Sequence, residues 1–348
     1  MRERWDTLDI LKCLCAFGVV TIHRGFPGPA GVRLRLLFRF AVPVFFMITG
    51  FFFRDTLERG REKGQIRKIF RLMAGANLFF FLLGLFLVLQ KGKGVEGVVL
   101  RCTQYFSWEK LRDFFLANES PFKSHLWYLG AILYVLLLAS YLAKKKRLWI
   151  LGALTPLLLA GDLAFGKYSL LLWNQEISYI YVRNYLFVGL PFFYMGYWLG
   201  CRREWIQRKM NPFLMFLLFV GSLLFFGTSL LEKRYLVSRG LNASREQYIS
   251  TTLMALCVFL FFVGWKKYYG GGWVSRFFAA IGRRYSTWIY ILHPGVITAY
   301  SLIFARKEGA LYELYSRCMP LVLFVTTTVL AALIQLFLEL SRRRGAEP

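Results

Sequence analysis

The first apolar segment of the chain carries three ionisable residues whose types and spacing could do chemistry. Asp9 and Lys12 lie near its start, and His23 lies near its end, in the stretch VVTIHRGFPGP. Histidine is the side chain best suited to proton transfer near neutral pH. In an α-helix, Lys12 and His23 would share one face, about 16 Å apart along the axis. Asp9 precedes Lys12 by one helical turn, so the two side chains could pair.

Two interpretations of this segment stay open from the residues alone. Ionisable groups inside a membrane span cost about 2.5–3.5 kcal/mol each at the helix centre, so they usually face a cavity or a partner. We therefore expect the face of Lys12, Ala16 and His23 to line a solvated polar passage. Alternatively, Lys12 extends to the lipid headgroups and His23 simply lies at the opposite membrane surface.

A pair of cations, Lys68 and Arg71, lies one helical turn apart at the start of the third apolar segment. Paired cations of this kind can hold a phosphate group at a membrane surface. Further candidates lie at the starts of later segments or within them. These are His125 in HLWYLGAILY, Arg183 and Asn184 in YVRNYLFVGLPFF, and His293 beside a proline in WIYILHPGVI. A structural role is the simpler interpretation for each histidine, whereas Arg183 and Asn184 suit a substrate contact equally well.

The elements that must position these residues are membrane helices. The sequence is 57% hydrophobic, and its apolar blocks have the length of about 20 residues that crosses a bilayer as a helix. We predict an all-α, polytopic helical bundle that forms a single domain over residues 1–348, with about ten spans. The expected spans are 9–26, 36–53, 70–89, 125–143, 148–165, 185–200, 212–231, 249–265, 285–305 and 318–340. The connection 90–124 is expected to form a small cap or a re-entrant piece.

The charge pattern favours lipid over nucleic acid as the partner of this chain. The formal net charge is +26, but the cations are spread over the connections between apolar blocks instead of gathering in one segment. With the N-terminus in the cytoplasm, cationic density is roughly twofold higher on the cytoplasmic side. We therefore expect a multi-pass protein of the cell membrane with both termini in the cytoplasm, and no nucleic-acid binding. The six cysteines show no metal-ligand spacing, so no metal site is expected.

Several of these motifs, in this order, resemble the acyltransferase-3 family of membrane proteins. Lys12 followed by His23 is similar to the family's basic-residue-x10-His signature, and FAVPVFFMITGFFF to its second-helix pattern. Lys68 and Arg71 resemble its R-x-x-R pair, with lysine in the first position. HLWYL, RNYLFVGLPFF and YILHP follow in similar places. HLWYL and RNYLFVGLPFF are also similar to the membrane half of vancomycin-resistance-type serine racemases.

The resemblance implies an enzyme that transfers an acyl group, expected to be acetyl, to a hydroxyl of a cell-surface glycan, lipid or related acceptor. The donor would be cytoplasmic acyl-CoA, expected to be acetyl-CoA, which acts as a co-substrate. No tightly bound cofactor is expected. In this interpretation His23 is the catalytic residue, and the donor phosphates are held by Lys12, Lys68 and Arg71. Arg183 and Asn184 contact the acceptor, and the supporting residues are Asp9, His125 and His293.

Functions without a covalent step are the competing expectation. Buried charges and broken helices in a membrane bundle also suit a transporter or flippase. Against transport, the sequence shows no inverted repeat and no matching pair of helices interrupted by glycine or proline. An amino-acid-binding membrane module is a third possibility, suggested by the similarity to the racemases.

Overall fold

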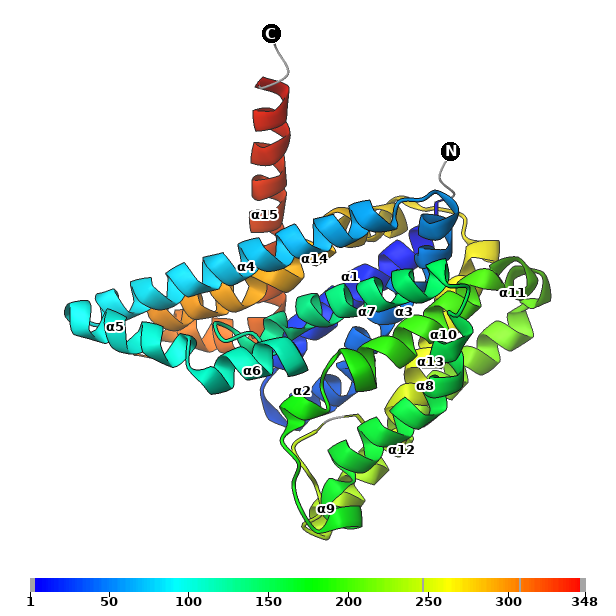
Figure 1. Ribbon diagram of the computed structural model, residues 1–348, viewed down its shortest axis with the longest axis horizontal. Helices are drawn as coiled ribbons and strands as arrows, with labels where there is room; N and C mark the ends of the chain where they lie inside the picture. The colour runs from blue at the N-terminus through cyan, green and yellow to red at the C-terminus, as the bar shows by residue number, and fades with distance from the viewer. Residues whose placement is uncertain (1–3, 246, 307, 345–348) are drawn as a thin grey trace. The chain divides into compact units, whose positions relative to one another are not determined.

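The computed structural model describes residues 4–245, 247–306 and 308–344, and these residues form helices and connections without a strand. The α-helices before the middle of the chain are α1 (Asp6–His23), α2 (Gly28–Leu37), α3 (Ala41–Glu58), α4 (Glu62–Gln90), α5 (Gly94–Tyr105), α6 (Trp108–Ala117), α7 (Trp127–Lys144), α8 (Trp149–Asp162) and α9 (Ser169–Trp173). Those that follow are α10 (Leu190–Cys201), α11 (Arg203–Lys209), α12 (Pro212–Ser238), α13 (Ile249–Trp265), α14 (Trp273–Ile303) and α15 (Ala310–Arg344) (Figure 1). Short 3-10 and π-helical turns lie between them, including η2 (Ser124–Leu126), η3 (Leu163–Lys167) and η5 (Tyr185–Gly189). The predicted all-α membrane fold is confirmed.

Each of the ten expected spans contains helix, but they differ in how well they suit a bilayer. Within the described residues, 7 helical segments are long and apolar enough to cross a membrane. They are Gly28–Glu58, Glu62–Gln90, Ser124–Lys144, Trp149–Lys167, Pro212–Ser238, Ile249–Tyr268 and Ala310–Ser341. The helix Tyr185–Cys201 is apolar but shorter. The remaining two, α1 and α14, carry His23 and His293 and are not among these seven segments.

The chain divides into two compact units, which are described separately. The first comprises residues 1–45, 204–232 and 250–348, and the second comprises residues 46–203 and 233–249. The prediction of one functional domain over the whole chain stays a prediction.

The first unit is organised by the pairing of α1 with α14, which lie side by side although they come from opposite ends of the sequence (Figure 1). α15 packs on both helices. It bends at Cys318, whose φ of −110° and ψ of 15° are not helical, just before Pro320. A proline within a helix removes one backbone hydrogen bond and commonly bends it.

In the second unit, α5 folds back along the end of α4, and α4 also packs on α7 (Figure 1). α5 and α6 occupy the connection that the sequence predicts as a cap or a re-entrant piece. α8 packs on α10 and on the π-helical turn η5. Glycines allow α3 and α10 to approach closely: a Cβ at Gly196 would lie 2.0 Å from the carbonyl oxygen of Met47. Small residues at such crossings are typical of membrane helix packing.

Candidate active site

α1 and α14 approach each other so closely that their backbones are in contact. A Cβ built at Gly282 of α14 would lie 1.8 Å from the carbonyl oxygen of Asp9 on α1, so only glycine fits at this crossing. Along the rest of the contact, side chains of α1, α14 and α15 form an apolar cluster. Its buried members are Cys13, Ala16, Val20, Ile281, Ile289, Val296 and Leu323.

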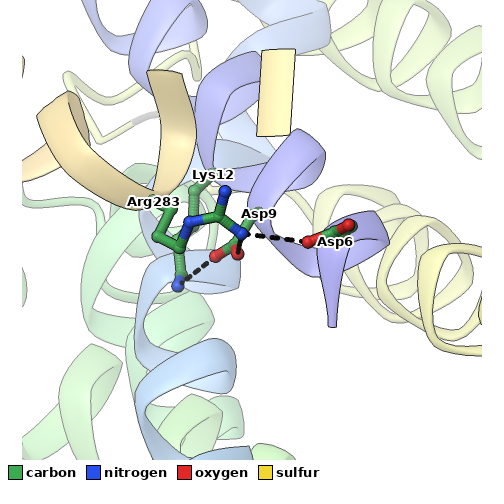
Figure 2. Close-up of polar contacts among 4 residues, drawn as sticks. All are labelled: Asp6, Asp9, Lys12 and Arg283. Carbon is green, nitrogen blue, oxygen red and sulfur yellow. Dashed lines mark hydrogen bonds and ion pairs between the residues drawn. The ribbon is translucent and has the colours of Figure 1, made fainter. Parts of the chain in front are cut away.

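One end of this helix pair holds four charged side chains in a row (Figure 2). Lys12 Nζ donates to Asp9 Oδ1 at 2.8 Å. On the other side of the buried Asp9 carboxylate, Arg283 Nη1 lies 3.4 Å from Asp9 Oδ2 and 3.0 Å from Asp6 Oδ1. Two cations therefore balance two carboxylates, which offsets the cost of removing Asp9 from water.

The network contains one contact that the sequence predicts and one that it does not. The pairing of Asp9 with Lys12 follows from their spacing within a single helix and is present. Arg283 lies in the stretch IGRRYSTWIY, where its charge suggested only a cytoplasmic connection. The signal that could have identified it is an arginine directly before an apolar segment, opposite a buried carboxylate that needs a second partner.

The other end of the helix pair brings two histidines together. The ring centroids of His23 and His293 are 4.9 Å apart, with the ring planes inclined at 45°. His23 is the last residue of α1 and is exposed, because the following Gly-Phe-Pro-Gly-Pro sequence ends the helix. His293 is fully buried on α14. The first unit thus places one accessible imidazole beside one buried imidazole.

The hydrogen bond of His293 fixes which of its nitrogens carries a proton in the neutral ring. Nδ1 lies 3.0 Å from the carbonyl oxygen of Ile289, one turn earlier on the same helix. A carbonyl oxygen only accepts hydrogen bonds, so Nδ1 is the donor and Nε2 is left as the basic nitrogen. His293 is therefore held in the tautomer that can accept a proton at Nε2.

The solvated passage expected along α1 is wrong for the part of the helix between Lys12 and His23. Ala16 and Val19 lie on the same helical face and are only 1% and 3% exposed. Ala16 packs within the apolar cluster of α1, α14 and α15. Helical periodicity places these residues on one face, but it does not show that other helices pack against that face. Along this stretch of the described residues, the face is a packing surface.

In the second unit, Arg183 lies in a half-buried polar and aromatic site. Its Nη2 donates to Glu119 Oε2 at 2.9 Å. Its guanidinium carbon lies 4.6 Å from the ring centroid of Tyr179 and 5.3 Å from that of Trp127. Burial raises the pKa of Glu119, and the nearby Arg183 only partly offsets that effect. Glu119, in the stretch LANESPF, was not predicted as a site residue.

Asn184 and His125 have structural roles in this unit. The side-chain oxygen of Asn184 accepts hydrogen bonds from the backbone N–H groups of Leu186 and Phe187, at 2.9 and 3.1 Å. Asn184 therefore caps the helical turn that precedes α10. His125 is buried, and its ring makes an edge contact with Phe80 at a centroid distance of 5.0 Å. These contacts favour a supporting position for both residues.

The predicted phosphate clamp lies on α4. Lys68 and Arg71 are both exposed and one helical turn apart, the geometry expected for two cations that share an anion. They belong to the second unit, whereas Lys12 belongs to the first.

A buried charged cluster at the end of α8 was not predicted as a site. Arg245 Nη2 lies 3.0 Å from Asp162 Oδ1, and the two side chains are 10% and 2% exposed. Nearby, the buried Lys167 donates to the side-chain oxygen of Asn242 at 3.0 Å and to the carbonyl oxygen of Ala243 at 2.6 Å. Because Asn242, Ala243 and Arg245 all lie in the connection to α13, the cluster ties this connection to the end of α8.

The described residues contain no group of three or more histidine, cysteine, aspartate or glutamate side chains that could hold a metal ion. No curated protein and no solved structure shows a significant match to this chain. A family model described as an acyltransferase domain matches residues 5–337, nearly the whole sequence. Together with the apolar helices, this match shows that the chain belongs to the acyltransferase-3 family and is a multi-pass membrane acyltransferase.

Proposed function

We propose that this enzyme transfers an acyl group from cytoplasmic acyl-CoA to a hydroxyl of a cell-surface glycan, lipid or related acceptor, and that this acyl group is acetyl. The observation that carries the proposal is the contact of His23 with His293 in a chain of this family. An exposed imidazole beside a buried basic nitrogen is suited to moving a proton to and from a hydroxyl group.

In the simplest reaction, His23 acts as the general base. It removes the proton of the acceptor hydroxyl while the hydroxyl oxygen attacks the thioester carbonyl carbon. The carbon–sulfur bond then breaks, and the CoA thiolate takes the proton from the imidazolium of His23. In the second form, His23 attacks the thioester itself and carries the acyl group to the acceptor as an acyl-imidazole. His293 serves as a positioning residue in either form, since its basic Nε2 favours the charged or proton-donating state of the neighbouring ring.

The donor is proposed to bind through its phosphates. Lys68 and Arg71 are the candidates for the first contact, because they are exposed and closely spaced. Lys12 is a further candidate, but Asp9 already holds its ammonium group at 2.8 Å. A phosphate would therefore have to compete with the Asp9 carboxylate for Lys12, which makes Lys68 and Arg71 the principal donor site.

The proposed orientation follows from the distribution of cations. With the more cationic side of the membrane taken as cytoplasmic, both termini lie in the cytoplasm.

The acceptor is proposed to contact Arg183. The Arg183 guanidinium lies against the faces of Trp127 and Tyr179, and flat apolar surfaces beside a charged group are typical of carbohydrate and headgroup recognition sites. Asn184 and His125 would support this site through the contacts described above.

Acyl transfer can be tested with purified protein, radiolabelled acetyl-CoA and a crude cell-envelope fraction. We expect label in the envelope material with the wild type, and none with His23→Ala. Arg24→Ala, at the exposed next residue, is the matched control and should retain activity if both variants insert in equal amounts. Full activity of His23→Ala would remove His23 from the chemistry. Movement of substrate across the membrane without labelling would favour the transporter or flippase instead.

The two forms of the reaction differ when the acceptor is omitted. If His23 carries the acyl group, wild-type protein incubated with the donor alone should become labelled, and hydroxylamine should remove the label. If His23 is a general base, the protein should stay unlabelled. His293→Phe should in either case lower kcat more than it changes KM, and should shift the acid limb of the pH–rate profile.

A further inference from the structure

In the second unit, the end of α4 and the facing side of α5 line a cavity of about 270 Å³. Three of the residues that line it are the cations Lys91, Lys93 and Arg101. Lys91 and Lys93 come from the turn between the helices, and Arg101 comes from two helical turns further along α5. None of the lining residues in the described part of the chain is acidic. The cavity is therefore electropositive.

The other walls of the cavity are apolar and closely packed. Leu87, Val88 and Leu100 contribute aliphatic side chains. α5 is held tightly against α4, since a Cβ at Gly84 would lie 2.1 Å from the hydroxyl oxygen of Tyr105. The cavity thus combines an electropositive end with an apolar interior.

The position of the cavity in the sequence places it at a membrane surface. α4 is one of the segments that can span a bilayer, and it ends at Gln90, directly before the cationic turn. α5 exposes Val95 and Val99, which are 77% and 56% exposed. A helix with exposed aliphatic side chains and cations at the end of a span is typical of a segment that lies in the membrane interface.

We propose that this cavity binds the headgroup phosphate of an anionic phospholipid. Lys91, Lys93 and Arg101 would hold the phosphate through charge-assisted hydrogen bonds. The first N–H groups of α5 lack partners within the helix and point towards the same turn, which adds a favourable dipole. The aliphatic walls formed by Leu87, Val88 and Leu100 would contact the first part of an acyl chain. A free inorganic anion would use only the cations, so the apolar lining favours a lipid.

The test compares two triple variants of the full chain in detergent micelles. Lys91→Ala, Lys93→Ala and Arg101→Ala remove the proposed site. Lys144→Ala, Lys145→Ala and Arg147→Ala form the matched control, because they remove the same three charges from an exposed turn between α7 and α8. Binding of phosphatidylglycerol is measured by native mass spectrometry, with phosphatidylcholine as the uncharged comparison.

We expect phosphatidylglycerol affinity to fall about tenfold or more in the site variant and to stay near the wild-type value in the control. Phosphatidylcholine should bind weakly to all three proteins. An unchanged site variant, or an equal loss in both variants, would overturn the proposal. Displacement of the lipid by inorganic phosphate at equal concentration would show that a free anion is the ligand, and would also overturn it.

A single substitution covers the case in which the triple site variant does not fold. Leu100→Trp fills the apolar part of the cavity and leaves all three cations in place. It should weaken phosphatidylglycerol binding without changing the weak binding of inorganic phosphate. Unchanged lipid affinity in a folded Leu100→Trp protein would contradict the proposed position of the acyl chain. None of these residues belongs to the proposed acyl-transfer site, so the variants should keep basal acyl transfer. Lost lipid binding with normal acyl transfer therefore tests the lipid site separately from the proposed function.

Discussion

Replacing Gly282 by alanine tests the contact between α1 and α14 directly. The added Cβ would lie 1.8 Å from the carbonyl oxygen of Asp9 and 2.8 Å from the backbone nitrogen of Cys13. Ordinary van der Waals contact begins at 3.4 Å, so the helices would have to separate by roughly 1.6 Å at this point. Both obstructing atoms belong to the backbone, and therefore no change of rotamer can relieve the clash.

The magnitude follows from comparison with a glycine that has room. Gly227 of α12 has nothing within 4 Å of its Cβ position, so Gly227→Ala is the matched control. Each substitution gains about 1 kcal/mol of helix propensity, and only Gly282→Ala carries the steric cost of overpacking, about 1–3 kcal/mol. We expect Gly282→Ala to be less stable than Gly227→Ala by about that steric cost.

The same displacement should affect the chemistry, because α1 positions His23 and α14 positions His293. A misplacement of about 1 Å can lower the rate of an enzyme by about 10²-fold. The assays are the thermal unfolding midpoint in detergent and the transfer of label from acetyl-CoA into envelope material. If Gly282→Ala matches Gly227→Ala in both measurements, the close crossing described here is incorrect.

Three further predictions concern the second unit. Arg71→Ala should raise the donor KM several-fold more than the acceptor KM, whereas Arg71→Lys should recover part of the loss; equal changes in both KM values would contradict the phosphate clamp. Burial raises the pKa of Glu119 despite Arg183, so the stability of the wild type relative to Glu119→Gln should be greatest below a pH of about 4.5. This stability difference should fall as the pH rises through the raised pKa of Glu119. Unfolding midpoints of both proteins between pH 4 and 8 measure it, and a stability difference that rises with pH would refute the prediction. Asp162→Leu should cost about 3–5 kcal/mol by leaving Arg245 without its buried partner, and the double variant Asp162→Leu, Arg245→Leu should recover most of that loss. Denaturant or thermal unfolding of the wild type and these two variants would show no recovery if the pair were unimportant.

The sequence predicts the features that depend on composition or on neighbouring residues. Runs of apolar residues show that the chain crosses a membrane, and the structure contains helix in each expected span. The spacing of Asp9 and Lys12 predicts their ion pair, because both lie on one helix. Local rules suffice for such features.

Features that join distant segments could not be predicted in this way. Arg283 contacts Asp6 across 277 residues of sequence, and nothing in either segment specifies the other. For the same reason, the helical periodicity of α1 identified the face of Ala16 but wrongly predicted a solvated passage along it. The capping role of Asn184 was also not predicted from RNYLFV, whereas its proposed substrate contact stays a prediction.

The partnership of α1 with α14 has a consequence for how the protein is made. α1 leaves the ribosome well before α14, with Asp6, Asp9 and Lys12 exposed to the lipid or to the insertion machinery. The arginine that completes its charge balance is synthesised 274 residues after Asp9. Any intermediate that lacks α14 therefore contains an incompletely neutralised first helix and only one of the two neighbouring imidazoles. If His23 and His293 act as proposed, acyl transfer becomes possible only after α14 has entered the bilayer and packed on α1.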